Sequence, residues 1–206
     1  MQLAVASSNQ GKLKEIRAVL AELTPEVEVL GLDSFPALGP IEEPGESFEE
    51  NALHKAKTVA LHTGLISLAD DSGLEVDALG GKPGVYSARF SGEGASDAAN
   101  NAKLLRLLEQ VPGEDRGARF RCVLAVYSPS GQHFLCEGSW EGRIAFSPAG
   151  DRGFGYDPLF IDPDSGLTAA QMDPSAKNER SHRGRALQRF SVLWPDFVRH
   201  HQSPER

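Results

Sequence analysis

Two adjacent carboxylates near the middle of the chain are the residues best suited to chemistry. Asp70 and Asp71 directly follow the apolar run LISLA at residues 65–69, so we expect them at the tip of a buried strand, before a Ser-Gly turn. Carboxylates in contact raise the pKa of one member or need a cation to offset their repulsion. Mg²⁺ prefers oxygen ligands and suits such a place. In the alternative, one aspartate caps the turn and the other is solvated. Glu42 and Glu43 lie in a loop that could reach the same ion.

A second group could bind an anion. The segment SSNQGK at residues 7–12 joins a short apolar run to a predicted amphipathic helix. Free N–H groups at the helix start, the helix dipole and the Lys12 ammonium would converge on a phosphate. The alternative is an ordinary turn in which Ser8 or Asn9 caps the helix. The segment is not a Walker A loop, because its first glycine is missing and Leu13 replaces the final hydroxyl.

A third group could recognise a base. The segment GFGYDP at residues 153–158 places aromatic side chains and a carboxylate among glycines. Phe154 or Tyr156 could stack on a base and Asp157 could accept hydrogen bonds from it, unless the aromatic rings simply fill the core. SHRG at 181–184 puts an imidazole and a guanidinium at a predicted helix start, where the dipole disfavours cations. Recognition of an anion or a base edge is therefore favoured, and the three groups together indicate a Mg²⁺-dependent nucleotide enzyme.

The elements that must position these groups alternate early and become consecutive strands later. Hydrophobic spacing predicts strands at 2–6, 27–30 and 65–69, helices across 13–23, 48–63 and about 96–110, consecutive strands from 120 onward, and a final helix begun by Ser181. Ser47 and Glu50 form a capping box before the second helix. This order predicts an α/β fold in which a mixed sheet has flanking helices and two lobes with a cleft between them.

Composition excludes several classes of protein. The net charge of -8, from 21 basic and 29 acidic residues, argues against a general nucleic-acid binder, which needs a basic face. No apolar run approaches the ~20 residues needed to cross a bilayer, and the first residues lack the pattern of a signal peptide. Two cysteines do not suit a disulfide scaffold. We therefore expect a cytoplasmic protein with neither nucleic acid nor membrane as partner.

The ordered motifs carry a resemblance to a known family. SNQGKLKEI, SFEENALHKA, ADDSGLEVDALGGKPGVYSARFSG, FRCVLAV, GSWEGRI, GFGYDPLF and SHRGRAL together resemble the inosine/xanthosine triphosphate pyrophosphatase family. The resemblance implies one two-lobed domain over residues 1–206, with an elongated central sheet, and a homodimer. It also implies Mg²⁺-dependent hydrolysis of ITP, dITP and XTP between the α and β phosphates, which gives the monophosphate and pyrophosphate and clears the nucleotide pool.

The resemblance also assigns roles by position in this sequence. The catalytic residues it implies are Asp71, Lys12 and Lys55, and the metal ligands are Asp71 and Glu42, although Pro44 and Gly45 leave Glu43 open as the ligand instead. The phosphates would be held by Ser7, Ser8, Asn9, Gln10, Gly11 and Lys12, with Ser72 near the substrate. The base pocket would be formed by Phe154, Gly155, Tyr156, Asp157, Lys177, His182 and Arg183. In that pocket a 6-oxo purine offers an acceptor to Arg183, whereas the 6-amino group of adenine does not.

Two other functions remain open on the sequence. A related pyrophosphatase group acts on modified pyrimidines or on dTTP and UTP, but FGYDP followed by SHRG is not expected there. A nucleotide-binding module without catalysis is the other alternative. Because Asp71 and Lys12 are both present, nothing in the sequence favours such a loss.

Overall fold

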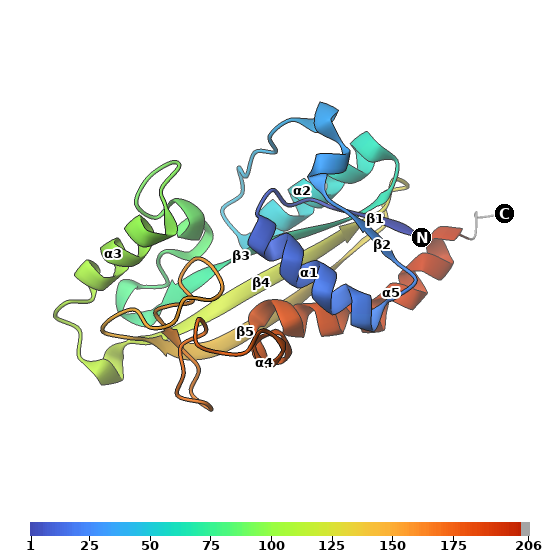
Figure 1. The fold of residues 1–206 in the computed structure, drawn as a ribbon. Coiled ribbons are helices and arrows are strands. Elements are labelled where there is room, and N and C mark those ends of the chain that lie inside the picture. The colour runs from blue at the N-terminus through green and yellow to red at the C-terminus, as the bar shows by residue number, and fades with distance from the viewer. Residues whose placement is uncertain (203–206) are drawn as a thin grey trace. The chain divides into compact units, whose positions relative to one another are not determined.

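The computed structural model describes residues 1–202, and within them six strands form one sheet (Figure 1). The strand order is β2-β1-β3-β4-β5-β6; β1 pairs in parallel with β2 and β3, and β5 pairs antiparallel with β6. The strands are β1 (Gln2–Val5), β2 (Glu28–Leu30), β3 (Ile66–Val76), β4 (Gly117–Tyr127), β5 (His133–Ile144) and β6 (Phe160–Ile161). The helices are α1 (Gln10–Leu23), α2 (Phe48–Thr63), α3 (Asp97–Leu107), α4 (Pro174–Arg180) and α5 (His182–Gln202). The predicted mixed α/β fold with flanking helices is confirmed.

The chain divides into two compact units. Unit 1 comprises Met1–Asp71, Cys122–Gly138 and the chain from Arg183 onward, and unit 2 comprises Ser72–Arg121 and Ser139–His182. The three long strands β3, β4 and β5 each contribute residues to both units. The boundaries fall inside the motifs singled out above, because Asp71 and Ser72 belong to different units, as do His182 and Arg183.

Unit 1 has an apolar core that joins two helices to the sheet. α1 contributes Leu13, Ile16 and Leu20, and α5 contributes Phe190 and Trp194. The strand residues in this core are Leu3, Val5, Ile66, Leu68, Cys122, Leu124, Val126 and Cys136. They alternate along their strands and therefore share one face of the sheet. α2 packs beside β1 with its own buried stripe, which lies outside this cluster.

Unit 2 has a second core rich in aromatic rings. The Phe120 ring lies 4.6 Å from the Phe160 ring, and the Trp140 and Phe160 ring centroids are 4.9 Å apart. α3 covers this core with Leu104 and Leu108 at its C-terminal end. The side chain of Ser96 accepts a hydrogen bond from the Ala99 N–H and so begins the helix where the sequence predicts it.

The strand that carries the two aspartates is longer than predicted. β3 continues to Val76, so Asp70 and Asp71 lie in its middle and the expectation that they end the strand is wrong. The physical reason is that Leu74 and Val76 extend the buried alternation across the Ser-Gly pair that we expected to turn. Because successive side chains of a strand point to opposite faces, the two carboxylates face opposite sides of the sheet.

The unit 1 core yields a test of the fold. Phe190 is fully buried, so Phe190→Ala is expected to lower the free energy of unfolding by about 3–5 kcal/mol. Val192, two residues along α5, is 74% exposed, and Val192→Ala is expected to change the free energy of unfolding by less than about 0.5 kcal/mol. Urea unfolding followed by circular dichroism measures both. Equal destabilisation by the two substitutions would contradict the placement of α5.

Candidate active site

Asp70 is the most enclosed charge of unit 1. Its carboxylate is 1% exposed and points to the face of the sheet that α1 and α5 cover. Oδ1 lies 2.5 Å from the Lys12 ammonium, and Oδ2 accepts from Arg183 Nε at 2.8 Å and from the Cys122 thiol at 3.1 Å. Burial alone would raise the pKa of Asp70, but Arg183 and Lys12 outweigh it and hold that pKa well below its usual value. Asp70 therefore stays ionised.

Arg183 is fixed by two acids of unit 1. Its guanidinium is 2% exposed at the start of α5, and Nη1 donates to Glu15 of α1 while Nε donates to Asp70. Burial would lower the pKa of Arg183, but the charges of Asp70 and Glu15 keep it raised. The guanidinium thus links the starts of α1 and α5 to the middle of β3.

Asp71 faces the other side of the sheet, towards α2. Its Oδ1 accepts a hydrogen bond from Lys55 Nζ at 3.0 Å, and the same ammonium donates to Glu43 Oε1 at 2.6 Å and to the backbone oxygen of Asp70 at 2.9 Å. An ammonium has three protons, so these three bonds use all of them. Lys55 therefore holds the two carboxylates together.

The ionisation of this group follows from burial and charge. Burial raises the pKa of Asp71, and the nearby Glu43 adds to the effect, while Lys55 and Lys12 oppose it without reversing it. For Lys55, burial lowers the pKa but Asp71 and Glu43 raise it further, so the ammonium stays charged. Asp71 is thus a carboxylate with raised basicity beside a fixed cation.

Asp71 also has a free oxygen that fits a metal. Its Oδ2 is buried and has no hydrogen-bond partner among residues 1–202. A buried oxygen without a partner is unfavourable, and a bound cation would relieve it. Within the same residues no set of three His, Cys, Asp or Glu side chains is arranged to hold a metal. An unpartnered carboxylate oxygen is a donor that suits a hard cation such as Mg²⁺.

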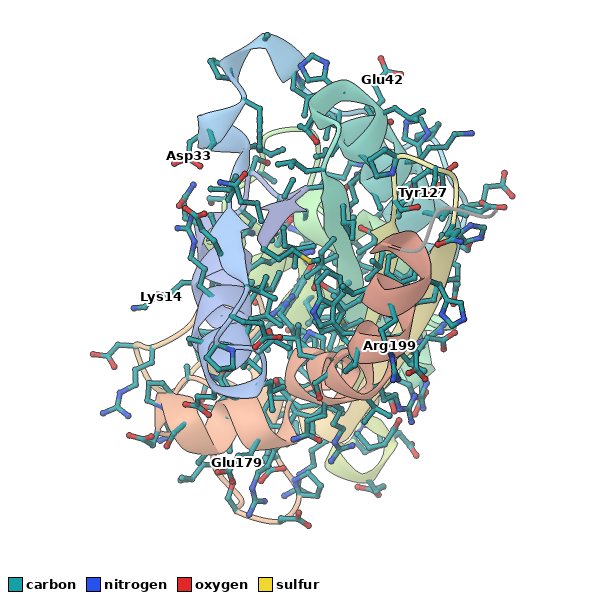
Figure 2. The ribbon with its side chains drawn as sticks, turned by 90° about the vertical axis from the view of Figure 1, so that its right-hand side faces the viewer. Lys14, Asp33, Glu42, Tyr127, Glu179 and Arg199 are labelled. Atoms are coloured by element: carbon teal, nitrogen blue, oxygen red, sulfur yellow. The ribbon has the colours of Figure 1, made fainter. Side chains whose placement is uncertain are left out.

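The two neighbouring glutamates differ in where they point. Glu43 reaches Lys55, whereas Glu42 is exposed and its labelled side chain is directed away from the ribbon in Figure 2. The structure thus brings Glu43 to the Asp71 group and leaves Glu42 in solvent.

The predicted phosphate loop forms the start of α1. Asn9 caps the helix, because its side chain accepts from the Lys12 N–H at 3.0 Å, and Ser7 Oγ accepts from the Asn9 N–H at 3.3 Å. Ser8 and Gln10 are exposed beside them. The first turn, which includes Gly11, carries N–H groups that have no partner inside the helix. The capping alternative is correct for Asn9, and it leaves this end of α1 able to bind an anion.

The predicted base group lies in unit 2, except for Arg183, which belongs to unit 1. Asp157 Oδ2 accepts from Lys177 Nζ at 2.7 Å and from the Phe154 N–H at 2.9 Å. Phe154 is half-buried, with the Lys177 ammonium 5.3 Å from its ring centre. Tyr156 is only 4% exposed and its hydroxyl donates to the Ser87 oxygen, so this ring fills the core. Phe154 is thus the aromatic residue of the motif with surface to offer.

His182 and Ser72 complete the predicted residues of unit 2. The imidazole is buried and stacks on Phe120, with ring centres 4.7 Å apart and planes 12° apart. Ser72 is half-buried directly after Asp71 in β3. Although His182 and Arg183 are neighbours in sequence, one contacts the aromatic core of unit 2 and the other contacts the acids of unit 1.

Sequence reasoning missed two residues of the unit 1 group. Glu15 pairs with Arg183, and Cys122 donates to Asp70. Glu15 stands three residues after Lys12, a spacing that places both on one side of a helix. Cys122 belongs to the alternating buried positions of β4, so its face could be predicted but its partner could not.

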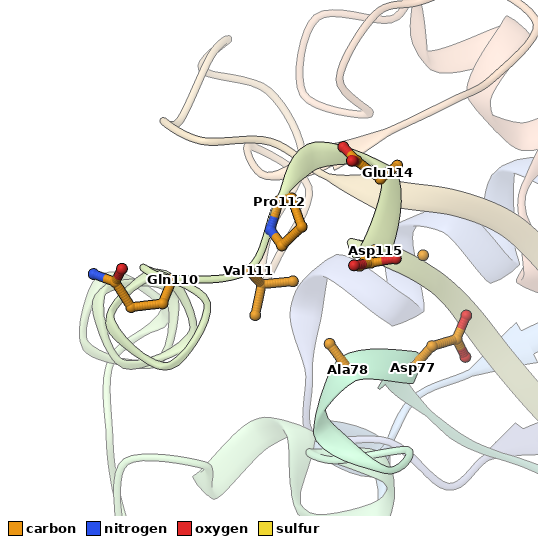
Figure 3. A pocket seen from close by; sticks show the side chains of 8 residues that line it. Asp77, Ala78, Gln110, Val111, Pro112, Glu114 and Asp115 are labelled. Atoms are coloured by element: carbon orange, nitrogen blue, oxygen red, sulfur yellow. The ribbon is translucent and has the colours of Figure 1, made fainter.

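A hollow in unit 2 does not suit a triphosphate. It has a volume of about 590 Å³ and lies between Ala78, of the 3-10 segment η3 (Asp77–Leu79), and the chain between α3 and β4, where Val111 and Pro112 face it (Figure 3). Its lining includes three carboxylates and no basic residue: Asp77, Ala78, Gln110, Val111, Pro112, Glu114, Asp115 and Gly117. None of the predicted site residues is among them.

Comparisons with known proteins agree with these motifs. The profile of the Ham1 family matches residues 3–192. The dITP/XTP pyrophosphatase of Nitratidesulfovibrio vulgaris is 56% identical over 203 residues, which cover 96% of this chain and 97% of that protein. The dITP/XTP pyrophosphatase of Geobacter sulfurreducens is 56% identical over 186 residues, or 90% and 92% of the two chains.

A solved structure has the same fold over nearly the whole chain. A HAM1 protein from Coxiella burnetii superposes with a TM-score of 0.85 at 42% identity, covering 95% of this chain and 99% of that one. None of the helices in residues 1–202 combines the length and hydrophobicity that a bilayer crossing requires. The family profile, the relatives and the superposition agree, and the chain belongs to the Ham1 family.

Proposed function

We propose that this protein hydrolyses the non-standard purine nucleoside triphosphates ITP, dITP and XTP to monophosphate and pyrophosphate. Relatives named dITP/XTP pyrophosphatase match it over almost their whole length. The observation that carries the proposal is the Asp71 group, in which a basic carboxylate with a free buried oxygen stands beside Lys55 and Glu43. Such a group suits a bound cation and the activation of water.

Asp71 and Glu43 would hold the metal in this proposal. Bound Mg²⁺ would neutralise phosphate oxygens and favour ionisation of water. Asp71 accepts a proton from the attacking water while the water oxygen bonds to the α-phosphorus. The bond from that phosphorus to the bridging oxygen breaks. The pyrophosphate leaves with the bonding electrons. Lys55 favours the ionised form of Asp71 and holds Glu43 next to it, which is a positioning role.

Lys12 would act on the phosphates. Its side chain is 16% exposed at the start of α1, where the first-turn N–H groups could also bind an anion. Asp70 positions this ammonium through an ion pair, and Arg183 positions Asp70 in the same way. Charge that develops on the leaving pyrophosphate is stabilised by donors already in place. The loop from Ser7 to Gly11 would contribute its backbone groups to the same phosphates.

The base would be recognised by unit 2. Phe154 offers a ring for stacking, and Asp157 with Lys177 offers an acceptor and a donor beside it. His182 is held by its stack on Phe120, and Gly155 and Tyr156 belong to the same segment as Phe154 and Asp157. Ser72, next to Asp71 in β3, would lie near the substrate. A polar site that a wrong base leaves unpaired discriminates strongly. The contacts of Arg183 favour a role beside Asp70 over one at the base.

The setting of the enzyme is part of the proposal. We infer from the family resemblance that it acts as a homodimer with Mg²⁺ in the cytoplasm, on free nucleotides and without nucleic acid or membrane partners. Light scattering coupled to gel filtration tests the dimer, for which the expected mass is twice that of the chain.

The substrate profile tests the reaction and the specificity together. Pyrophosphate release from ITP, XTP, GTP, ATP and dTTP is measured with Mg²⁺ and with EDTA. We expect metal-dependent release from ITP and XTP, with GTP and ATP slower by about 100-fold or more. Asp71→Asn should remove turnover while nucleotide binding persists.

The other outcomes separate the alternatives. Release of phosphate instead of pyrophosphate would contradict the α–β assignment. Faster turnover of dTTP would favour the pyrimidine-directed group, and wild-type protein that binds nucleotides without turnover would favour the non-catalytic module.

The neighbouring glutamates give a matched test of the metal site. Glu43→Gln is expected to raise the Mg²⁺ concentration for half-maximal activity by about tenfold or more, because it removes a carboxylate beside Asp71. Glu42→Gln should change it by less than about twofold, because Glu42 is exposed. Titration of activity with Mg²⁺ measures both variants. The reverse order of effects would assign the ligand to Glu42.

Arg183 can be assigned by combining stability with specificity. Arg183→Met leaves Asp70 buried without its guanidinium partner, so we expect the free energy of unfolding to fall by about 3–5 kcal/mol. Arg199→Met, at an exposed ion pair of the same helix, should change it by less than about 1 kcal/mol. At a temperature where the variant is folded, its kcat/KM should fall in proportion for ITP and GTP. A selective loss for ITP would place Arg183 at the base instead.

A further inference from the structure

The segment expected to meet the base is held from outside by one helix of unit 2. The N–H of Gly155 donates to Asp97 Oδ2 at 2.6 Å, and the oxygen of Gly155 accepts from Asn101 Nδ2 at 2.9 Å. Asp97 and Asn101 stand four residues apart on α3, a spacing that places them on the same side of a helix. Both peptide groups of a single residue are thus fixed by one helix face.

The backbone of this segment needs such support. Gly155 has a φ of +61° and Gly153 has a φ of +75°, in the left-handed region that favours glycine. A Cβ on Gly153 would lie 2.0 Å from Asp157 Oδ2, so the glycine lets that carboxylate fold back to the Phe154 N–H. Glycines leave a chain flexible when nothing holds it. Internal bonds fix the Phe154–Asp157 side of the turn, and α3 fixes the Gly155 peptide.

α3 is itself firmly attached to its surroundings. Asn100 is buried and bonds to the Ser91 N–H and the Ala88 oxygen, between Asp97 and Asn101 in sequence. A helix anchored in this way transfers its position to the segment that it holds. Asp97 also acts on the next residue of the segment, because burial and, after it, the Asp97 charge raise the pKa of Tyr156.

We propose that Asp97 and Asn101 are positioning residues for base recognition, which set the place of Phe154 through the Gly155 peptide. The inference rests on the proposed function, because it takes residues 153–158 to meet the base. A first-turn aspartate is often explained by the helix dipole alone. Asp97 also accepts a 2.6 Å hydrogen bond from the Gly155 N–H, 58 positions along the chain, and so holds that segment as well.

The kinetic test compares four variants. Asp97→Ala and Asn101→Leu each remove one bond, Asp97→Asn keeps an acceptor, and Arg106→Ala changes an exposed residue of the same helix. We expect the first two to raise KM for ITP about five- to tenfold with kcat nearly unchanged, and to lower the ITP-to-GTP ratio of kcat/KM. Inhibition by IMP should weaken in the same variants, whereas inhibition by pyrophosphate should not change. Asp97→Asn should restore most of the loss and Arg106→Ala should match the wild type.

A second measurement does not depend on activity. Hydrogen exchange of the Gly155 amide is expected to be about five- to tenfold faster in Asp97→Ala and unchanged in Arg106→Ala, because one hydrogen bond protects it.

Wild-type protein that fails to hydrolyse ITP would overturn the proposed function, and with it the link to base recognition. Wild-type turnover of ITP with equal KM, equal ITP-to-GTP ratio and equal exchange in Asp97→Ala would overturn this inference alone. An equal fall in kcat/KM for ITP and GTP would show that Asp97 and Asn101 have only a structural role.

Discussion

The alternation of β3 at Asp70 and Asp71 is the constraint from which the chemistry of unit 1 follows. A strand directs neighbouring side chains to opposite faces, so the two carboxylates meet different partners. A buried carboxylate requires a cation or several donors. On one face Lys12 and Arg183 meet this requirement, and on the other Lys55 does. The helices α1, α2 and α5 therefore each place a basic residue next to one of the two aspartates.

The two faces give two carboxylates different tasks. Asp70 is held ionised by a cation on each of its two oxygens. Asp71 keeps one oxygen without a partner in the described part of the chain and has a raised pKa. One residue thus orients cations and the other is available for reaction. The repulsion that makes the pair unusual as a sequence is removed by geometry before any metal binds.

Local patterns predicted α1, α2, α3 and the start of α5, because the signals of these helices are local, but they did not predict the short helix α4. The predicted capping box before α2 forms only in part: Ser47 accepts from the Glu50 N–H, but the Glu50 side chain accepts from the Glu46 N–H instead of that of Ser47. Ser96 caps α3 by the same side-chain bond as Ser47. The end of β3 was wrong because Ser-Gly is a common turn pair, while the buried side chains of Leu74 and Val76 hold the strand together. The bond between Arg183 and Asp70 joins residues 113 positions apart, which no local pattern can indicate. The placement of Glu43 rather than Glu42 beside Lys55 depends on a loop path that spacing does not fix.

The four paired charges of Lys12, Glu15, Asp70 and Arg183, of which Asp70 and Arg183 are buried, have a consequence for how the sequence can vary. Two acids and two bases sum to zero charge, and each charged group contacts another member. Removing the charge of Lys12 or Arg183 leaves the buried Asp70 with less compensation, whereas a paired substitution need not. These four positions should therefore depend strongly on one another in evolution. A neutral apolar replacement of one of them becomes tolerable only after its partner has changed.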